Sequence, residues 1–271
     1  MTTPTFTHKV YDNFVLSTLV EDQFNSHLNL QNLITVDNSL SGVPGMIWKV
    51  HKYKATDGTE FLEVGKGNTK SIAVSYEEDE HKIKLAQNRF DYYDEQAMTD
   101  PMLVPVGMQH AGTDMFNTVN KEIYGELLKA TLEVTATKPD FGAFVDAVAK
   151  LNFENPENKE IYALVSVDDV ASIRKELKED LKYVESFSRT GYIGTVAGVN
   201  IYTKKDAEKG TIVVATRKAV TLFNKVGTQV EQSLRSQEEA NIRLNSIFTR
   251  KYFVVALTDE REVVKLKINA L

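Results

Sequence analysis

The chain has 271 residues, of which 42% are hydrophobic, a formal net charge of -6 and no cysteine. This length suffices for one large core or two subdomains, and the absence of cysteine excludes disulfides, thiol nucleophiles, Cys-based zinc sites and iron-sulfur clusters. The negative charge argues against strong sequence-independent binding of nucleic acid, which needs many contacts from Lys and Arg to phosphate. The sequence has no apolar run long enough to span a membrane and no secretory signal pattern, so we expect folding in a cytoplasm and no membrane partner.

The first 42 residues are rich in Thr, Asn and Ser, with apolar side chains scattered among them. This pattern is too apolar for a free tail and too irregular for a clear helix. We therefore predict an arm that docks on another surface.

An extended hairpin is predicted next. Residues 46–56 mix apolar and charged side chains on both faces of a strand, and the pair Asp57-Gly58, a strong hairpin signal, separates them from residues 60–64. Such a hairpin is ill suited to one intramolecular core, so we expect it to lie across a neighbouring subunit. The expected contact residues on it are Trp48, Val50, Tyr53, Phe61 and Leu62.

The following segment predicts strands and then a long helix. Apolar residues alternate over 72–76 and 83–85, while the acidic run 77–80 between them is typical of a solvated loop. Asp100-Pro101 indicates a helix start, and apolar residues then recur at helical spacing towards Ala130. Pro105, Gly107 and Gly112 favour a kink or a late start of this helix.

From residue 138 the pattern changes to short elements that predict a compact α/β subdomain. An apolar helix stripe over 141–151 precedes a strand at 161–165, and Ser166 with Asp169 three residues later predicts a capped helix. Gly191, Gly194 and Gly198 are expected in turns that lead into a strand ending at Thr203. The remaining segments predict a strand at 211–215, a return to the first sheet over 229–248, and a final hairpin of 251–257 with 262–268.

We find no pattern that carries chemistry, and we therefore predict no catalytic residue, no cofactor and no metal. The five histidines stand alone, residues 65–70 lack the spacing of a phosphate-binding loop, and the acidic groups at 77–80 and 91–95 are typical of solvated surface. Charges are balanced in the Arg-rich stretch 235–250, which favours ion pairs at a subunit contact over phosphate binding. The charged residues expected there are Arg235, Glu238, Arg243 and Arg250.

This order of motifs, and above all residues 161–203 and 238–268, resembles the major capsid (major head) proteins of tailed bacteriophages. The resemblance implies an α+β phage major capsid fold with an N-terminal arm (1–42), an extended hairpin loop (43–75), a peripheral domain with a long spine helix (76–138 and 222–271) and an axial domain (139–221). Some members of the family form Lys to Asn cross-links. Lys54, Lys66 and Lys70 lie in the corresponding region, but no residue here matches that site one for one.

The resemblance also implies a function, which is self-assembly of hexamers and pentamers into an icosahedral or prolate head shell that encloses DNA. A separate scaffolding protein and a portal are the implied partners, and the implied location is the virion, with assembly in the cytoplasm of a bacterial host. Three alternatives remain open at this point: an encapsulin-type bacterial nanocompartment shell, which shares the fold and encloses an enzyme, a tail or connector component, and an α+β enzyme that uses one of the acidic clusters.

Overall fold

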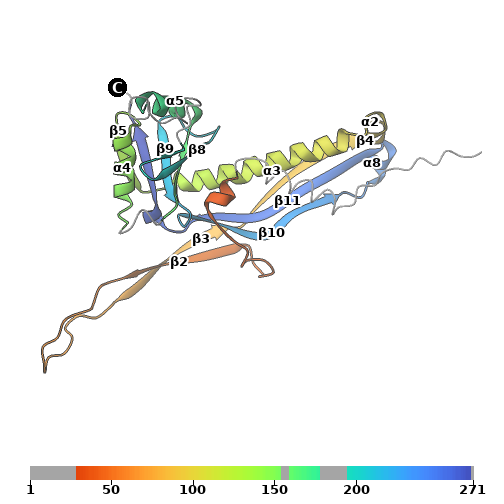
Figure 1. The fold of residues 1–271 in the computed structure, drawn as a ribbon. Coiled ribbons are helices and arrows are strands. Elements are labelled where there is room, and N and C mark those ends of the chain that lie inside the picture. The colour runs from red at the N-terminus through yellow and green to blue at the C-terminus, as the bar shows by residue number, and fades with distance from the viewer. Residues whose placement is uncertain (1–28, 154–158, 178–193, 270–271) are drawn as a thin grey trace, which may run out of the picture.

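The computed structural model (Figure 1) describes residues 29–153, 159–177 and 194–269, so most of the predicted arm lies outside the described residues. These residues form a four-stranded sheet beneath one long helix, a six-stranded sheet, and a two-stranded ribbon that projects away from both sheets. None of the helices within these ranges is long and apolar enough to cross a membrane.

The long helix α3 (Leu103–Leu127) has 25 residues and spans about 38 Å. It begins at Leu103, two residues after Pro101, so the start predicted from Asp100-Pro101 is nearly correct and the later start is wrong. The Asp100 carboxylate accepts a hydrogen bond from the Met102 backbone N–H at 2.9 Å. The helix is continuous through Gly107. A Cβ atom at this position would come within 2.4 Å of the Phe90 ring, so the glycine allows α3 to lie close to the sheet.

The four-stranded sheet beneath α3 runs in the order β1-β10-β11-β4, with β1 parallel to β10 and the other pairs antiparallel. Alternate residues of β11, such as Ile247, Phe253 and Val255, face the helix and belong to its core. Short helices close the far end of this elongated body. The elements are η1 (Leu30–Leu33), β1 (Thr35–Asp37), β4 (Lys84–Tyr93), α2 (Asp94–Thr99), β10 (Val220–Gln232), α8 (Gln237–Asn241) and β11 (Leu244–Leu257).

The six-stranded sheet is buried on both faces. Helices α4 and α5 pack on one face, and the C-terminal half of α3 packs on the other, where Val119, Ile123 and Leu127 share a core with Leu164 and Val213. The strand order is β5-β12-β9-β6-β8-β7. The elements are β5 (Leu132–Ala136), α4 (Phe141–Lys150), β6 (Ile161–Val165), α5 (Val167–Glu176), β7 (Thr195–Val196), β8 (Val199–Thr203), β9 (Thr211–Thr216), η3 (Glu260–Glu262) and β12 (Val263–Ile268).

Local predictions in this body are mostly confirmed. Strand β6 is buried at every position, and the Ser166 side chain caps α5 by accepting from the Asp169 N–H at 3.1 Å. Gly194 and Gly198 have positive φ at turns, as expected, whereas Gly191 lies outside the described residues. The predicted stripe of α4 is wrong in part, because Phe141 and Val145 are exposed. Phe144 and Leu151 are buried as predicted, and the small residues Ala143 and Ala147 are buried in place of the two exposed ones.

Two predictions about pairing are wrong. Residues 251–257 and 262–268 do not form a hairpin, since β11 pairs with β10 and β4 while β12 pairs with β5 and β9 in the other sheet. Residues 262–268 were also expected to return to the first sheet, but β12 lies in the six-stranded sheet with β5 and the strands of residues 161–216. The division into domains stays a prediction. Alternation predicts a strand but does not identify its partner, and β12 buries Val263, Val264 and Leu266, which only a sheet covered on both faces can accommodate.

The predicted hairpin of residues 46–56 with 60–64 is wrong as well. Strand β2 (Ile47–Ala55) pairs instead with β3 (Val74–Lys82), and the connection runs over residues 56–73. The acidic run 77–80, expected in a loop, lies inside β3. Its carboxylates face lysines across the ribbon, and this cross-strand match outweighs the low strand propensity of a charge run.

Candidate assembly surface

The ribbon of β2 and β3 has no core of its own. Its nine pairs run antiparallel from Ile47 opposite Lys82 to Ala55 opposite Val74, and these two strands form a separate sheet. Figure 1 shows the ribbon leaving the base of the molecule and extending into solvent. An isolated two-stranded hairpin is marginally stable in water, so this element needs support from elsewhere.

Ion pairs across the two strands supply part of that support. The Lys49 ammonium lies 3.2 Å from Glu78 and 2.9 Å from Glu80, and Lys54 lies 2.7 Å from Glu77. Hydrogen bonds with Glu80 and Glu78 raise the pKa of Lys49, and the Lys49 ammonium in turn lowers the pKa of Glu80. These groups are exposed to solvent, which screens them, so the pairs fix the register of the strands more than they stabilise the ribbon.

The base of the ribbon is anchored on the chain's own sheet. Trp48 packs on Phe223 with ring centroids 3.8 Å apart, and its ring lies 6.0 Å from that of His81. These side chains join a small core with Ile83 and Val254. Trp48, which we expected at a subunit contact, therefore holds the ribbon to its own subunit, and any contact with a neighbour is a further role.

The tip of the ribbon is a folded loop. The two carboxylate oxygens of Glu60 accept hydrogen bonds from Thr69, one from the hydroxyl at 2.6 Å and one from the backbone N–H at 2.8 Å, and these bonds lower the pKa of Glu60. Gly58 is buried against Ile72, where a Cβ atom would lie 2.8 Å from a backbone nitrogen. The loop conformation is thus defined by specific contacts even though it lies in solvent.

This folded tip presents large apolar side chains to water. Phe61 and Val64 are completely exposed and Leu62 is 48% exposed. Along the strands behind them, Tyr53 and Tyr76 face each other with ring centroids 6.2 Å apart, and both are more than half exposed. Large apolar side chains that gather exposed on one element make it a candidate for contact with another molecule.

The sequence prediction identified only one strand of this surface. The structure brings Tyr53, Phe61 and Leu62 onto one exposed element, while the side chain of Val50 lies outside the described part of the structure. Sequence reasoning placed three alternating residues on a strand of a sheet, and the structure leaves all three exposed: Ile72, Val74 and Tyr76. Their alternation is visible in the sequence, but alternation does not show which face of the strand packs against a core.

The predicted charged contact lies at the opposite end of the molecule. There, Arg235 pairs with Asp94, Arg243 pairs with Glu95, and Arg250 lies 2.7 Å from Glu231. All three ion pairs form within the chain: the first two join α2 to the residues that flank α8, and the third joins β11 to β10. Glu238 lies in the first turn of α8. A role of these four residues between subunits stays a prediction.

The lysines considered for cross-linking take part in ion pairs on the ribbon. Lys54 pairs with Glu77, and Lys66 lies 2.8 Å from Glu63 within the tip. Lys70 follows Thr69 on the same loop. These contacts are compatible with a structural role alone, so cross-linking also stays a prediction.

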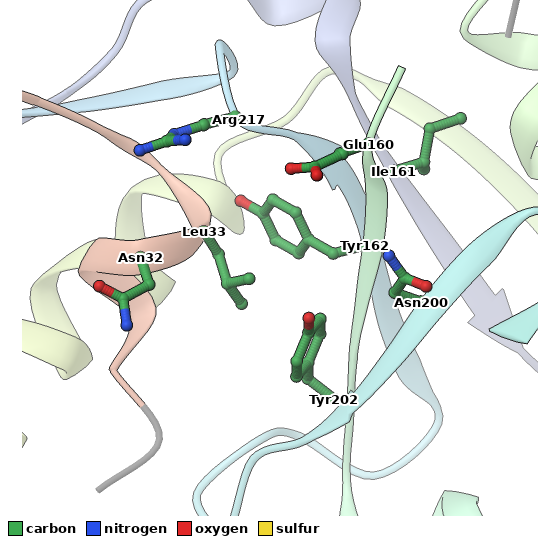
Figure 2. A pocket seen from close by; sticks show the side chains of 8 residues that line it. All are labelled: Asn32, Leu33, Glu160, Ile161, Tyr162, Asn200, Tyr202 and Arg217. Carbon is green, nitrogen blue, oxygen red and sulfur yellow. The ribbon is translucent and has the colours of Figure 1, made fainter. Parts of the chain in front are cut away.

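One small cavity opens where η1, the start of β6 and β8 meet (Figure 2). Its volume is about 80 Å³, enough for a few water molecules and far below the usual size of a ligand pocket. The buried Tyr162 hydroxyl points to this side without a hydrogen-bond partner, and burial raises the pKa of this group. Within the described ranges, no group of three His, Asp or Glu residues is placed to hold a metal. The ribbon is therefore the stronger candidate for function.

Comparisons with known proteins agree on the fold. No protein-family model and no curated protein matches the sequence. Solved structures do match: the mature capsid of bacteriophage PhiM1 has a TM-score of 0.70 at 11% identity over 100% of this chain and 93% of that one. The capsid of a native GTA particle gives 0.68 at 13% identity over 100% and 95%. A virus-like particle from Pyrococcus furiosus gives 0.66 at 12% identity over 95% and 100%.

The chain therefore has the α+β fold of phage major capsid proteins, as the sequence predicted. The match to the PhiM1 capsid subunit spans 100% of this chain. At such low identity the comparisons establish the fold alone.

Proposed function

We propose that this chain is the major capsid protein of a tailed bacteriophage and that its copies assemble into a closed head shell. The observation that carries the proposal is the ribbon, which is ordered by its own contacts and yet exposes Tyr53, Phe61, Val64 and Tyr76 to solvent. A monomer gains nothing from this arrangement. The solved structures that share this fold are capsids, so a capsid shell is the assembly that we propose for the ribbon.

The shape of the molecule supports contacts of a head-to-tail kind. The ribbon and the charged end formed by α2 and α8 lie at opposite ends of the subunit (Figure 1), so the two surfaces cannot contact each other within one subunit. Contacts between two different surfaces of identical chains produce rings when the rotation closes. Hexamers and pentamers are such rings, and together they close a shell.

The finer parts of the proposal follow from this role. The shell would be icosahedral or prolate, would enclose DNA without sequence-specific contacts, and would be assembled in the bacterial cytoplasm with a separate scaffolding protein and a portal. The net charge of -6 is compatible with a container that does not adhere to its contents. No specific feature favours the nanocompartment, the tail component or the enzyme over this role.

The test compares the purified protein with a variant in which residues 49–80 are replaced by a short Gly-Asn-Gly turn between Trp48 and His81, which lie opposite each other in the ribbon. We expect large closed shells, or rings of five and six, for the full chain in size-exclusion chromatography and negative-stain electron microscopy. We expect a folded subunit that forms neither for the variant.

One outcome would contradict the proposal, and a second would contradict only the role of the ribbon in it. A full-length protein that remains a monomer or dimer at high concentration is not a capsid subunit. Shells of normal size from the variant would leave the assembly role intact but remove the ribbon from it. Circular dichroism and a cooperative unfolding transition serve as controls that the shortened chain is folded.

A further inference from the structure

The turn from β2 into the tip of the ribbon contains a residue pair with a chemistry of its own. Asp57 is followed by Gly58, and the sequence has no other Asp-Gly pair and no Asn-Gly pair. The carboxyl group of an aspartate can cyclise with the backbone nitrogen of the next residue. A glycine in the next position leaves that nitrogen accessible, because glycine has no side chain. Asp57-Gly58 is therefore the pair in this chain that is best suited to form a succinimide.

The structure leaves the two reacting groups without competing contacts. The Asp57 side chain is exposed to solvent. Among the described residues, neither its carboxylate nor the Gly58 backbone N–H takes part in a hydrogen bond or an ion pair. The nearby Glu60 carboxylate differs, because it accepts two hydrogen bonds from Thr69 and would have to break them before it reacted. Asp57 has no such bonds to lose.

The backbone on both sides of this pair is held in place. Thr56 is joined to Ala73 by two hydrogen bonds of 3.0 Å, one between the backbones and one from the Ala73 N–H to the Thr56 hydroxyl. The bonds of Glu60 fix the chain on the other side. Between these points Gly58 packs so closely that a Cβ atom would lie 2.8 Å from the Ile72 nitrogen. One additional backbone atom here must displace Gly58 or break one of these hydrogen bonds.

We propose that Asp57-Gly58 is a site of spontaneous isomerisation to isoaspartate, which makes subunits that stay unassembled unfit for assembly. In the first step the Gly58 nitrogen bonds to the Asp57 Cγ, and the carboxyl hydroxyl leaves with the amide proton as water. A water molecule then opens the succinimide ring at either of its carbonyl groups. Opening at the former main-chain carbonyl leads the chain through Cβ and Cγ, which adds one backbone atom. One water leaves and one returns, so the mass does not change.

The product alters the part of the ribbon that carries the exposed apolar side chains. An extra backbone atom at Asp57 moves Gly58 from its contact with Ile72 and changes the loop that presents Phe61 to solvent. This consequence rests on the proposed function, because it affects assembly only if the ribbon contacts a neighbour. A neighbour that covers the tip also restrains the loop and slows cyclisation. The reaction therefore acts on free subunits and spares assembled ones.

The first experiment follows the reaction on the unassembled subunit. The protein is incubated at neutral pH in water enriched in heavy oxygen, digested with trypsin in ordinary water and analysed by mass spectrometry. Opening of the ring takes one oxygen atom from the solvent, so we expect heavy oxygen in the peptide of residues 55–66. Methylation by an isoaspartyl methyltransferase identifies the isoaspartate in the same peptide.

Two controls accompany this measurement. Asp57→Glu keeps the negative charge but would have to form a larger ring, so we expect it to take up no heavy oxygen in this peptide. Asp206 is a second exposed aspartate, and it precedes Ala207, whose methyl group hinders attack by the nitrogen. We expect the parent protein to take up heavy oxygen faster at Asp57 than at Asp206.

The second experiment measures whether the product is excluded from shells. Subunits aged until part of them has isomerised are allowed to assemble, shells are separated from the remaining subunits, and the isoaspartate content of each fraction is measured. We expect the aged parent to lose assembly in proportion to its isoaspartate content, with isoaspartate enriched in the remaining subunits. Asp57→Glu aged in the same way should assemble to the same extent as when fresh.

The outcomes separate this inference from the proposed function. Uptake of heavy oxygen at Asp57 that is no faster than at Asp206 overturns the modification site and leaves the capsid role intact. Equal isoaspartate content in shells and remaining subunits overturns the effect on assembly, again without affecting the capsid role. A parent protein that never assembles overturns the capsid role and this effect together, while the first experiment still decides whether the site reacts.

Discussion

The six-stranded body and the ribbon differ in how they are stabilised. In the body, β6 and β9 are almost entirely buried, and Phe144 fills the space between α4 and the sheet with no exposed surface. The ribbon has two strands, cross-strand ion pairs and an aromatic residue in full contact with water at its tip. The first region has a complete core in one chain, and we propose that the second is covered by another molecule on assembly.

This difference shows that a large apolar residue has two distinct uses in the same molecule. Phe144 contributes to the free energy of folding, because it leaves water when the chain folds. Phe61 stays in water when the chain folds and can contribute only on assembly. The same residue type therefore reports on folding in one region and on association in the other.

A pair of matched truncations gives the largest expected difference between the two regions. Phe144→Ala should lower the free energy of unfolding by about 3–5 kcal/mol because it leaves a cavity in a packed core. Phe61→Ala should change that of the unassembled subunit by no more than about 0.5 kcal/mol. Urea unfolding followed by circular dichroism measures both.

The comparison fails if the two variants are destabilised equally. That result would mean that Phe61 packs within its own subunit in solution. An assembly assay completes the contrast, because the folded Phe61→Ala protein should show a large defect in assembly.

A second pair of substitutions tests how closely α3 lies on its sheet. Gly107→Ala should destabilise the protein by about 1–3 kcal/mol, because the added Cβ would lie 2.4 Å from the Phe90 ring and the helix must move outward. Gly125→Ala lies in the same helix with open space around it and should stabilise the protein by up to about 1 kcal/mol. Thermal unfolding of both variants decides the matter, and equal effects would mean that helix propensity alone acts at both positions.

The smallest expected effect is electrostatic and concerns the edge of the six-stranded sheet. Lys265 and Lys267 on β12 each lie 2.7 Å from the Glu133 carboxylate on β5, and they lower the pKa of Glu133 from 4.5 to about 2. A pKa lowered by folding gives stability that is present above about pH 4.5 and is lost as the pH falls towards 2.

We therefore expect the thermal midpoint of the parent to exceed that of Glu133→Gln at neutral pH, and the gap to narrow as the pH falls from about 5 to about 2. Other carboxylates titrate in both proteins, so only the difference between them is informative. A gap that stays constant across this range would show that the two lysines do not act through the charge of Glu133.

The sequence predicted the body better than the ribbon, and the reason is physical. A buried strand such as β6, a capped helix such as α5 and the long stripe of α3 are specified by residues close in sequence, so periodicity and capping are sufficient to find them. The partners of β2 and β12 are not specified locally. Asp57-Gly58 has the composition of a hairpin turn, but here Gly58 packs against Ile72 within a longer loop.

The candidate site was predicted in outline for the same reason. An apolar and charged segment without a possible core pointed to a neighbouring subunit, which located Tyr53, Phe61 and Leu62. The exposure of Tyr76 was missed, because exposure depends on which elements cover a residue, and this follows from the tertiary fold. Trp48 was placed on the correct element, but its contact with Phe223 depends on a pairing that sequence alone does not give.

Amide hydrogen exchange measured on the assembled protein and on subunits dissociated from it would test most directly whether the ribbon is completed by another copy. We predict that amides of residues 47–82 exchange rapidly in the free subunit and become strongly protected on assembly, while those of β6 and β9 are protected in both states. Ribbon amides that exchange equally fast in both states would show that no neighbour covers this element and would contradict the account.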